Sequence, residues 1–94
     1  MSENDPVNRE TAAVLLAAFA EYMGAESGKG SVARYLDAHT ISPWAKDSVG
    51  VLTYEGIITG RDTGDFDPHA YLTRAETAVL ITRIIPYILD NFRI

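Results

Sequence analysis

The sequence predicts an all-α fold: a small helical domain in which three main helices are joined by short helical turns and loops. Apolar residues recur at helical spacing in three segments, and each segment has a start or stop signal at one or both ends. The 94 residues are 47% hydrophobic and 22% charged, a size and composition that supply one hydrophobic core and no second ordinary domain.

The first helix is predicted over residues 6–23, where Asn8 or Asp5-Pro6 provides the start signal. Gly24 stands where a left-handed C-terminal cap belongs. Spacing near 3.6 residues predicts that one face packs in the core. That face comprises Val7, Val14, Leu15, Ala18, Phe19 and Tyr22, whereas Arg9, Glu10 and Glu21 take other angles.

The second helix is predicted over residues 43–55, after a loop in which a short helical turn is expected around residues 32–36. Ser42 can cap free amides, and Pro43 suits the first helical position because its missing N–H costs nothing there. The helix ends at Gly56, which can adopt positive φ. Its core face carries Ala45, Val49 and Leu52.

The third helix is predicted over residues 73–85. Thr73 and Glu76 have the spacing of a capping box, and Phe66 is expected to point inward from the tight turn GRDTGDFDP that precedes it. Pro86 should kink or divide the helix near Ile85, leaving residues 87–92 as a separate turn. The predicted core comprises Phe19, Trp44, Leu52, Ile57, Phe66, Leu80 and Ile84.

An internal echo relates residues 7–19 to residues 72–84, with four identities in thirteen positions, and it pairs Arg9 with Arg74. A cation in the first turn of a helix costs about 0.3–1 kcal/mol against the macrodipole. A helix N-terminus with an arginine fork can receive a carboxylate or phosphate. Two interpretations of Arg74 therefore stay open: an anion pocket, or an internal ion pair with an acid. The acids considered are Asp37, Asp62 and Asp67.

Composition excludes several classes of partner. Thirteen acidic and eight basic residues give a net charge of −5, the wrong sign for a phosphate backbone, so no nucleic acid is expected. There are no cysteines, which removes disulfides, thiolate zinc sites and thiol nucleophiles. The longest apolar run, residues 12–20, is too short to span a bilayer, so no membrane insertion is expected. The residues before it are acidic, unlike those of a signal peptide.

No metal, cofactor or enzymatic activity is expected either. The aspartates of residues 62–67 lack the glycine and glutamate that a calcium loop requires. His39 and His69 have no ligand partners at metal-binding spacing, and no strand–turn–helix elbow frames Ser42 as a nucleophile. Trp44 has two interpretations, a core anchor or a half-exposed platform for a sugar ring.

Five short motifs stand in a fixed order: YLD at residues 35–37, PWA at 43–45, GIITG at 56–60, GDFDP at 64–68 and LTRAE at 72–76. On these motifs, residues 35–85 closely resemble the S-layer homology (SLH) module, an α-helical repeat of bacterial surface proteins. The N-terminal helix resembles the last helix of a preceding module. The expected division is a helix over 6–24, a variable loop over 25–34 and the module over 35–92.

This resemblance implies non-covalent anchoring at the bacterial cell surface, through binding of anionic secondary cell-wall polysaccharide that often bears pyruvate ketals. It also implies neighbouring modules or self-association as partners, and an extracellular location. The alternative is a protein–protein interaction or oligomerisation module without glycan binding.

The resemblance also assigns ligand-binding residues by position. Arg74 is the main groove contact, and Arg9 is a candidate for a second groove. Trp44, Gly60, Arg61 and Asp62 are weaker candidates that would line or support the first groove. The chain departs from the family pattern in two places: Arg61 replaces an aromatic residue, and residues 8–11 form a degraded TRAE motif.

Overall fold

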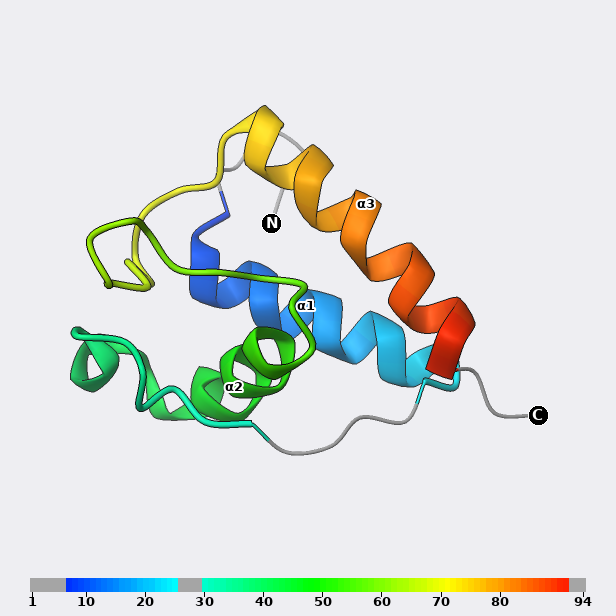
Figure 1. Cartoon of the computed structure of the whole chain (residues 1–94), viewed down its shortest axis with the longest axis horizontal. Coiled ribbons are helices and arrows are strands. Elements are labelled where there is room, and N and C mark those ends of the chain that lie inside the picture. The colour runs from blue at the N-terminus through cyan, green and yellow to red at the C-terminus, as the bar shows by residue number, and fades with distance from the viewer. Residues whose placement is uncertain (1–6, 26–29, 92–94) are drawn as a thin grey trace.

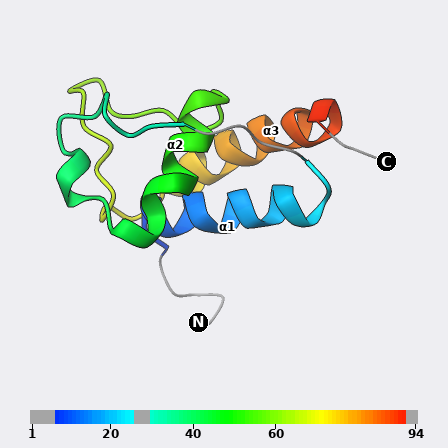
Figure 2. The same cartoon turned by 90° about the horizontal axis from the view of Figure 1, so that it is seen from below.

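The computed structural model describes residues 7–25 and 30–91, which form a helical domain without a β-strand in these ranges. Its elements, in chain order, are α1 (Arg9–Tyr22), the 3-10 turns η1 (Ala38–Thr40) and η2 (Pro43–Ala45), α2 (Lys46–Tyr54) and α3 (Arg74–Asn91). Helices α1 and α3 begin on the same side of the molecule and run toward the opposite side, with α2 packed against α1 (Figures 1 and 2). The predicted all-α class is confirmed.

Local signals correctly predicted the start of the first helix and the C-terminal ends of the first two helices. Asn8 is the N-cap of α1 and its Oδ1 accepts from the amide of Thr11 at 2.9 Å, whereas the alternative start at Asp5-Pro6 lies outside the described residues. Gly24 and Gly56 both have positive φ, 90° and 75°. In each case the amide of the following residue bonds back to the last helical turn, a Schellman ending whose left-handed φ glycine adopts without a Cβ penalty.

The prediction for Ser42 is wrong, because its side chain makes no capping hydrogen bond to the turn it precedes. Instead, Ser42 donates to Glu10 of α1, from its hydroxyl to Oε2 at 2.6 Å and from its amide to Oε1 at 2.9 Å. Glu10 is only 2% exposed. A carboxylate from another helix therefore serves the start of η2 and fastens that turn to α1. Pro43 does occupy the first helical position, as predicted.

Around residues 32–36 the chain turns, with the amide of Tyr35 bonded to the carbonyl of Val32 at 3.0 Å, but the 3-10 turn η1 begins only after Asp37. The helical turn predicted there is therefore displaced toward the C-terminus. The side chain of Asp37 explains the shift, because both its oxygens accept from the amides of Phe66 and Asp67 at 2.8 Å. These two hydrogen bonds hold residues 35–37 against the loop that contains Phe66 and Asp67.

The third helix is continuous through Pro86, so the predicted division near Ile85 is wrong. Proline removes one backbone hydrogen bond, to the carbonyl of Thr82, but both Thr82 and Pro86 are exposed and that carbonyl can reach water. Beyond the proline, Tyr87 and Ile88 are each 7% exposed and belong to the same core as the earlier turns. Burial of these side chains holds the last turns in the helix.

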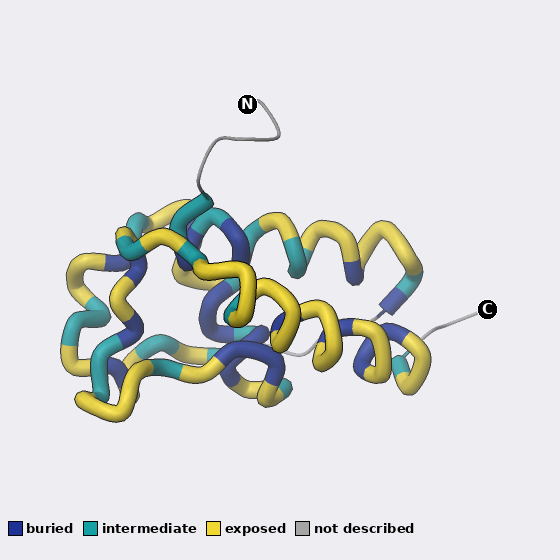
Figure 3. Tube along the Cα trace, turned by 90° about the horizontal axis from the view of Figure 1, so that it is seen from above, coloured by how far each residue is buried: buried dark blue, intermediate teal, exposed yellow. Residues whose placement is uncertain are grey.

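Two of the seven predicted core residues are wrong. Phe19 is 49% exposed and Trp44 is 60% exposed, whereas the remaining five are buried as predicted: Leu52, Ile57, Phe66, Leu80 and Ile84. The predicted face of α1 is also largely wrong, since Leu15, Phe19 and Tyr22 are exposed and only Val14 among its large residues packs against the core. Figure 3 shows buried positions on this helix alternating with exposed ones. The buried face is made of alanines and of two charged residues with internal partners, Arg9 and Glu10.

Candidate ligand-binding site

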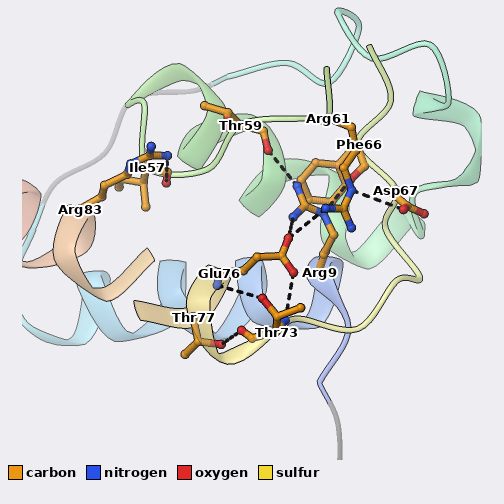
Figure 4. Close-up of polar contacts among 10 residues, drawn as sticks. All are labelled: Arg9, Ile57, Thr59, Arg61, Phe66, Asp67, Thr73, Glu76, Thr77 and Arg83. Carbon is orange, nitrogen blue, oxygen red and sulfur yellow. Dashed lines mark hydrogen bonds and ion pairs between the residues drawn. The ribbon is translucent and has the colours of Figure 1, made fainter. Parts of the chain in front are cut away.

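Arg9, the first residue of α1, is buried among acceptors from the module that follows it. Its Nε donates to the carbonyl of Phe66 at 2.8 Å, its Nη2 to the carbonyl of Thr59 at 2.8 Å, and its Nη1 to Oε2 of Glu76 at 3.1 Å (Figure 4). The guanidinium carbon lies 5.0 Å from the centroid of the Phe66 ring. Burial, followed by the charge of Arg61, lowers the pKa of Arg9. We call these acceptors the Arg9 socket.

The backbone at the start of α1 is also occupied. The amides of Arg9 and Glu10 donate to the carbonyls of Ala70 and Pro68, at 2.9 Å and 3.0 Å. An open groove would need free donors, and these are engaged within the chain. Arg9 therefore has a structural role in attaching α1 to the rest of the chain, and its assignment to a second ligand groove stays a prediction.

Glu76 links Thr73, at the start of α3, to the two arginines Arg9 and Arg61. Its Oε1 accepts from the amide of Thr73 at 2.9 Å, while its own amide donates to Oγ1 of Thr73 at 3.1 Å, which confirms the predicted capping box. Its Oε2 accepts from both Arg9 and Arg61, at 3.1 Å and 3.0 Å. The hydrogen bond from the Thr73 backbone, aided by the two arginines, lowers the pKa of Glu76.

Replacing Glu76 with glutamine should reduce the dependence of stability on pH. Because the folded-state pKa of Glu76 lies below the ordinary value of 4.5, its stabilising contribution is present above that pH and is lost as the pH falls through the lower folded value. Urea unfolding from about pH 7 to about pH 3 should show the variant less stable at neutrality and the difference shrinking on acidification. A matched control is Glu21→Gln, at an exposed position of α1 without a cation partner among the described residues. A constant difference between wild type and Glu76→Gln at all pH values would contradict this assignment.

Arg74 is the first residue of α3 and, unlike its counterpart Arg9, it is exposed. Across residues 7–25 and 30–91, no acid pairs with its guanidinium, and no acceptor meets the backbone amides of Arg74 and Ala75. The internal ion pair is therefore not formed. The three candidate acids have other positions: Asp37 binds loop amides, Asp67 lies 3.5 Å from Nε of Arg61, and Asp62 is exposed.

A pocket of about 280 Å³ lies between the loop at residues 58–61 and the face of α3. It brings together Gly60 and Arg61 of the predicted site and has Arg9 in its wall, whereas Arg74, Trp44 and Asp62 lie outside its lining. Gly60 has no room for a side chain, because a Cβ there would stand 2.6 Å from Cε1 of Tyr35. The full lining is Arg9, Ile58, Thr59, Gly60, Arg61, Leu72, Ala75, Glu76, Val79, Leu80 and Arg83.

Sequence reasoning missed two charged residues of the pocket lining: Arg83, and Glu76, which was predicted only as part of a helix cap. Their spacing of seven residues is a signal that could have found them, because positions seven apart share one face of a helix. Within the described residues no group of three or more histidine, cysteine or acidic side chains could hold a metal ion. Among the same residues, no helix is long and apolar enough to cross a membrane.

Comparison with known proteins adds a family to this geometry. Residues 34–78 match the model of the S-layer homology domain. The chain is 33% identical over 61 residues to a surface-layer 125 kDa protein of Lysinibacillus sphaericus, covering 62% of this chain and 5% of that protein. It is 40% identical over 48 residues to an S-layer protein of Bacillus thuringiensis subsp. finitimus, covering 51% of this chain and 6% of that protein.

A third relative, the S-layer protein sap of Bacillus anthracis, is 38% identical over 48 residues, which is 51% of this chain and 6% of that protein. No solved structure matches the chain. Residues 34–78 of this chain thus form an S-layer homology domain, which contains Arg61, Arg74 and Glu76, whereas Arg9 and Arg83 lie outside the matched residues. The finer division into a helix over 6–24, a loop over 25–34 and a module over 35–92 stays a prediction, and residues 1–6, 26–29 and 92–94 lie outside the described residues.

Proposed function

We propose that this domain anchors a bacterial surface protein non-covalently to the cell wall by binding anionic secondary cell-wall polysaccharide. The family match and the surface-layer relatives support the anchoring role and an extracellular location at the cell surface. The observation that carries the glycan assignment is Arg74 in the first turn of α3, an exposed guanidinium without a partner among residues 7–25 and 30–91.

The chemistry of such a site is equilibrium recognition. A carboxylate approaching α3 would meet the fork of Arg74 and the open amides of the first turn, and it would offset the unfavourable placement of a cation at the positive end of the helix. A pyruvate ketal presents one carboxylate on a sugar, which suits one guanidinium. Trp44, 60% exposed, keeps its interpretation as a stacking platform for a sugar ring. No bond-making step is involved, and we propose no enzymatic activity or cofactor.

Arg74→Ala should weaken retention on purified cell-wall sacculi by about ten- to a hundredfold, the range expected for a lost charge-assisted hydrogen bond pair. The matched control is Lys46→Ala, which removes one exposed cation from α2. Sacculi stripped of the polymer by acid should retain the wild type poorly. Equal retention on native and stripped sacculi, or full retention of Arg74→Ala with an intact circular dichroism spectrum, would contradict the proposal.

The second candidate, an interaction or oligomerisation module, is favoured by exposed apolar residues at helical spacing on two helices. On α1 they are Leu15, Phe19 and Tyr22, and on α3 they are Ile81, Ile85 and Leu89, each at least 48% exposed. Contiguous apolar surface of this kind is typical of docking sites. These stripes support neighbouring modules or self-association as partners, and they would remain intact in Arg74→Ala. Wall retention that survived this substitution would therefore favour the second candidate.

A further inference from the structure

The pocket between residues 58–61 and α3 has an excess of positive charge in a chain that is negative overall. Its lining holds three arginines, Arg9, Arg61 and Arg83, against one acid, Glu76, whereas the whole chain has a net charge of −5. A concave site lined by one sign of charge concentrates ions of the other sign. Such a pocket is suited to an anionic ligand.

The two ends of the pocket differ chemically (Figure 4). At one end Arg9 and Arg61 share Oε2 of Glu76, so both cations there already have a carboxylate. At the other end Arg83 makes a single long contact, from Nη1 to the carbonyl of Ile57 at 3.5 Å, and it is exposed. An arginine carries five N–H donors. Arg83 therefore has unused donors and, in the described chain, no acid partner.

Apolar side chains line the pocket along with the charged groups. They come from the loop and from α3: Ile58, Leu72, Ala75, Val79 and Leu80. Such a surface accepts a methyl group or the C–H face of a sugar ring, while the paired Arg61–Glu76 end offers donors and an acceptor for hydroxyls. The volume of about 280 Å³ suits a ligand of about one sugar unit.

We propose that Arg83 is a second carboxylate contact, which binds an acidic sugar unit in this pocket, apart from Arg74. The two arginines cannot share one carboxylate. Nine residues separate them on α3, which at about 100° per residue places them half a turn apart and about 14 Å apart along the axis. The inference rests on the proposed function for the class of ligand.

The test is a titration of the whole 94-residue chain, followed by NMR, with a methyl glycoside that bears a pyruvate ketal. The same glycoside without the ketal is the ligand control. Amide signals of Gly60, Arg61 and Val79 report occupancy of the pocket. Arg83→Gln should raise the dissociation constant measured at these signals at least fivefold. Arg34→Gln is the matched control, since it removes an exposed arginine outside the pocket lining and should change the constant less than twofold.

The result is separable from that of the proposed function. Wall retention of Arg74→Ala tests the proposed function, whereas the pocket signals of Arg83→Gln test the second carboxylate contact. Equal binding by wild type and Arg83→Gln, or no shift of the pocket signals by the ketal, would overturn the assignment of Arg83. Neither result would change the outcome for Arg74 on sacculi.

Discussion

Arg9→Ala is expected to lower the free energy of unfolding by about 3–5 kcal/mol, the range for breaking a buried, hydrogen-bonded charge pair by removing one partner. The substitution leaves two backbone carbonyls of the Arg9 socket, those of Thr59 and Phe66, without this donor, and it leaves Oε2 of Glu76 with Arg61 alone. It also removes the guanidinium from the face of the Phe66 ring. A small domain whose whole stability is about 5–10 kcal/mol would be close to unfolding.

Urea unfolding at neutral pH measures this loss, and the internal echo supplies its control. Arg74→Ala makes the same change at the equivalent position of α3, where the side chain is exposed, and should shift the free energy of unfolding by no more than about 0.5 kcal/mol. If Arg9→Ala is unfolded, Arg9→Lys should be folded but destabilised, because lysine keeps the charge and loses the planar fork. Similar losses for Arg9→Ala and Arg74→Ala would contradict the burial of Arg9.

Phe66→Ala is expected to cost about 3–5 kcal/mol, the usual loss for truncating a buried aromatic side chain. Phe66 is fully buried, its ring lies 5.2 Å from that of Tyr35, and it forms one wall of the Arg9 socket. The substitution therefore removes core packing and also weakens the attachment of α1 through the Arg9 socket. Loss of both should show as a lower urea midpoint at an unchanged slope.

Phe19→Ala is the matched control for this second result. Phe19 was predicted to be a core residue, but the structure leaves it 49% exposed on α1. Its truncation should cost about 1 kcal/mol or less, since much of the ring surface is already in contact with water. A loss as large as that of Phe66→Ala would mean that another surface covers this face of α1 in solution.

The features predicted correctly from sequence depend on residues a few positions apart. The positive φ at Gly56 and the capping box of Thr73 and Glu76 follow from the geometry of one helical turn. The burial of Phe66 was predictable because a single aromatic side chain in an otherwise polar turn is expected to point into the core. The five-motif pattern predicted the family, which hydrophobic spacing alone does not identify.

The face of α1 could not be predicted, because the partners of its charged residues are far away in the sequence. Arg9 bonds to Phe66 and Glu76 across 57 and 67 positions, and Glu10 bonds to Ser42 across 32. A helical wheel places arginine and glutamate on the solvent-exposed face, so the wrong face of this helix was predicted to be buried. The predicted burial of Trp44 was wrong for a related reason. A large aromatic side chain favours burial, but tertiary packing decides whether it is buried.

One carboxylate oxygen of Glu76 serves two cations that arrive from separate segments, and this sharing has a thermodynamic consequence. A ligand whose hydroxyls hydrogen-bonded to Arg61 in place of Glu76 would leave that oxygen to Arg9 alone. The ion pair between Arg9 and Glu76, and with it the attachment of α1, would then be stronger. Linkage is reciprocal, so a firmly seated helix would raise affinity for this ligand by the same factor. Ligand binding in the pocket and the attachment of α1 would then be strengthened together.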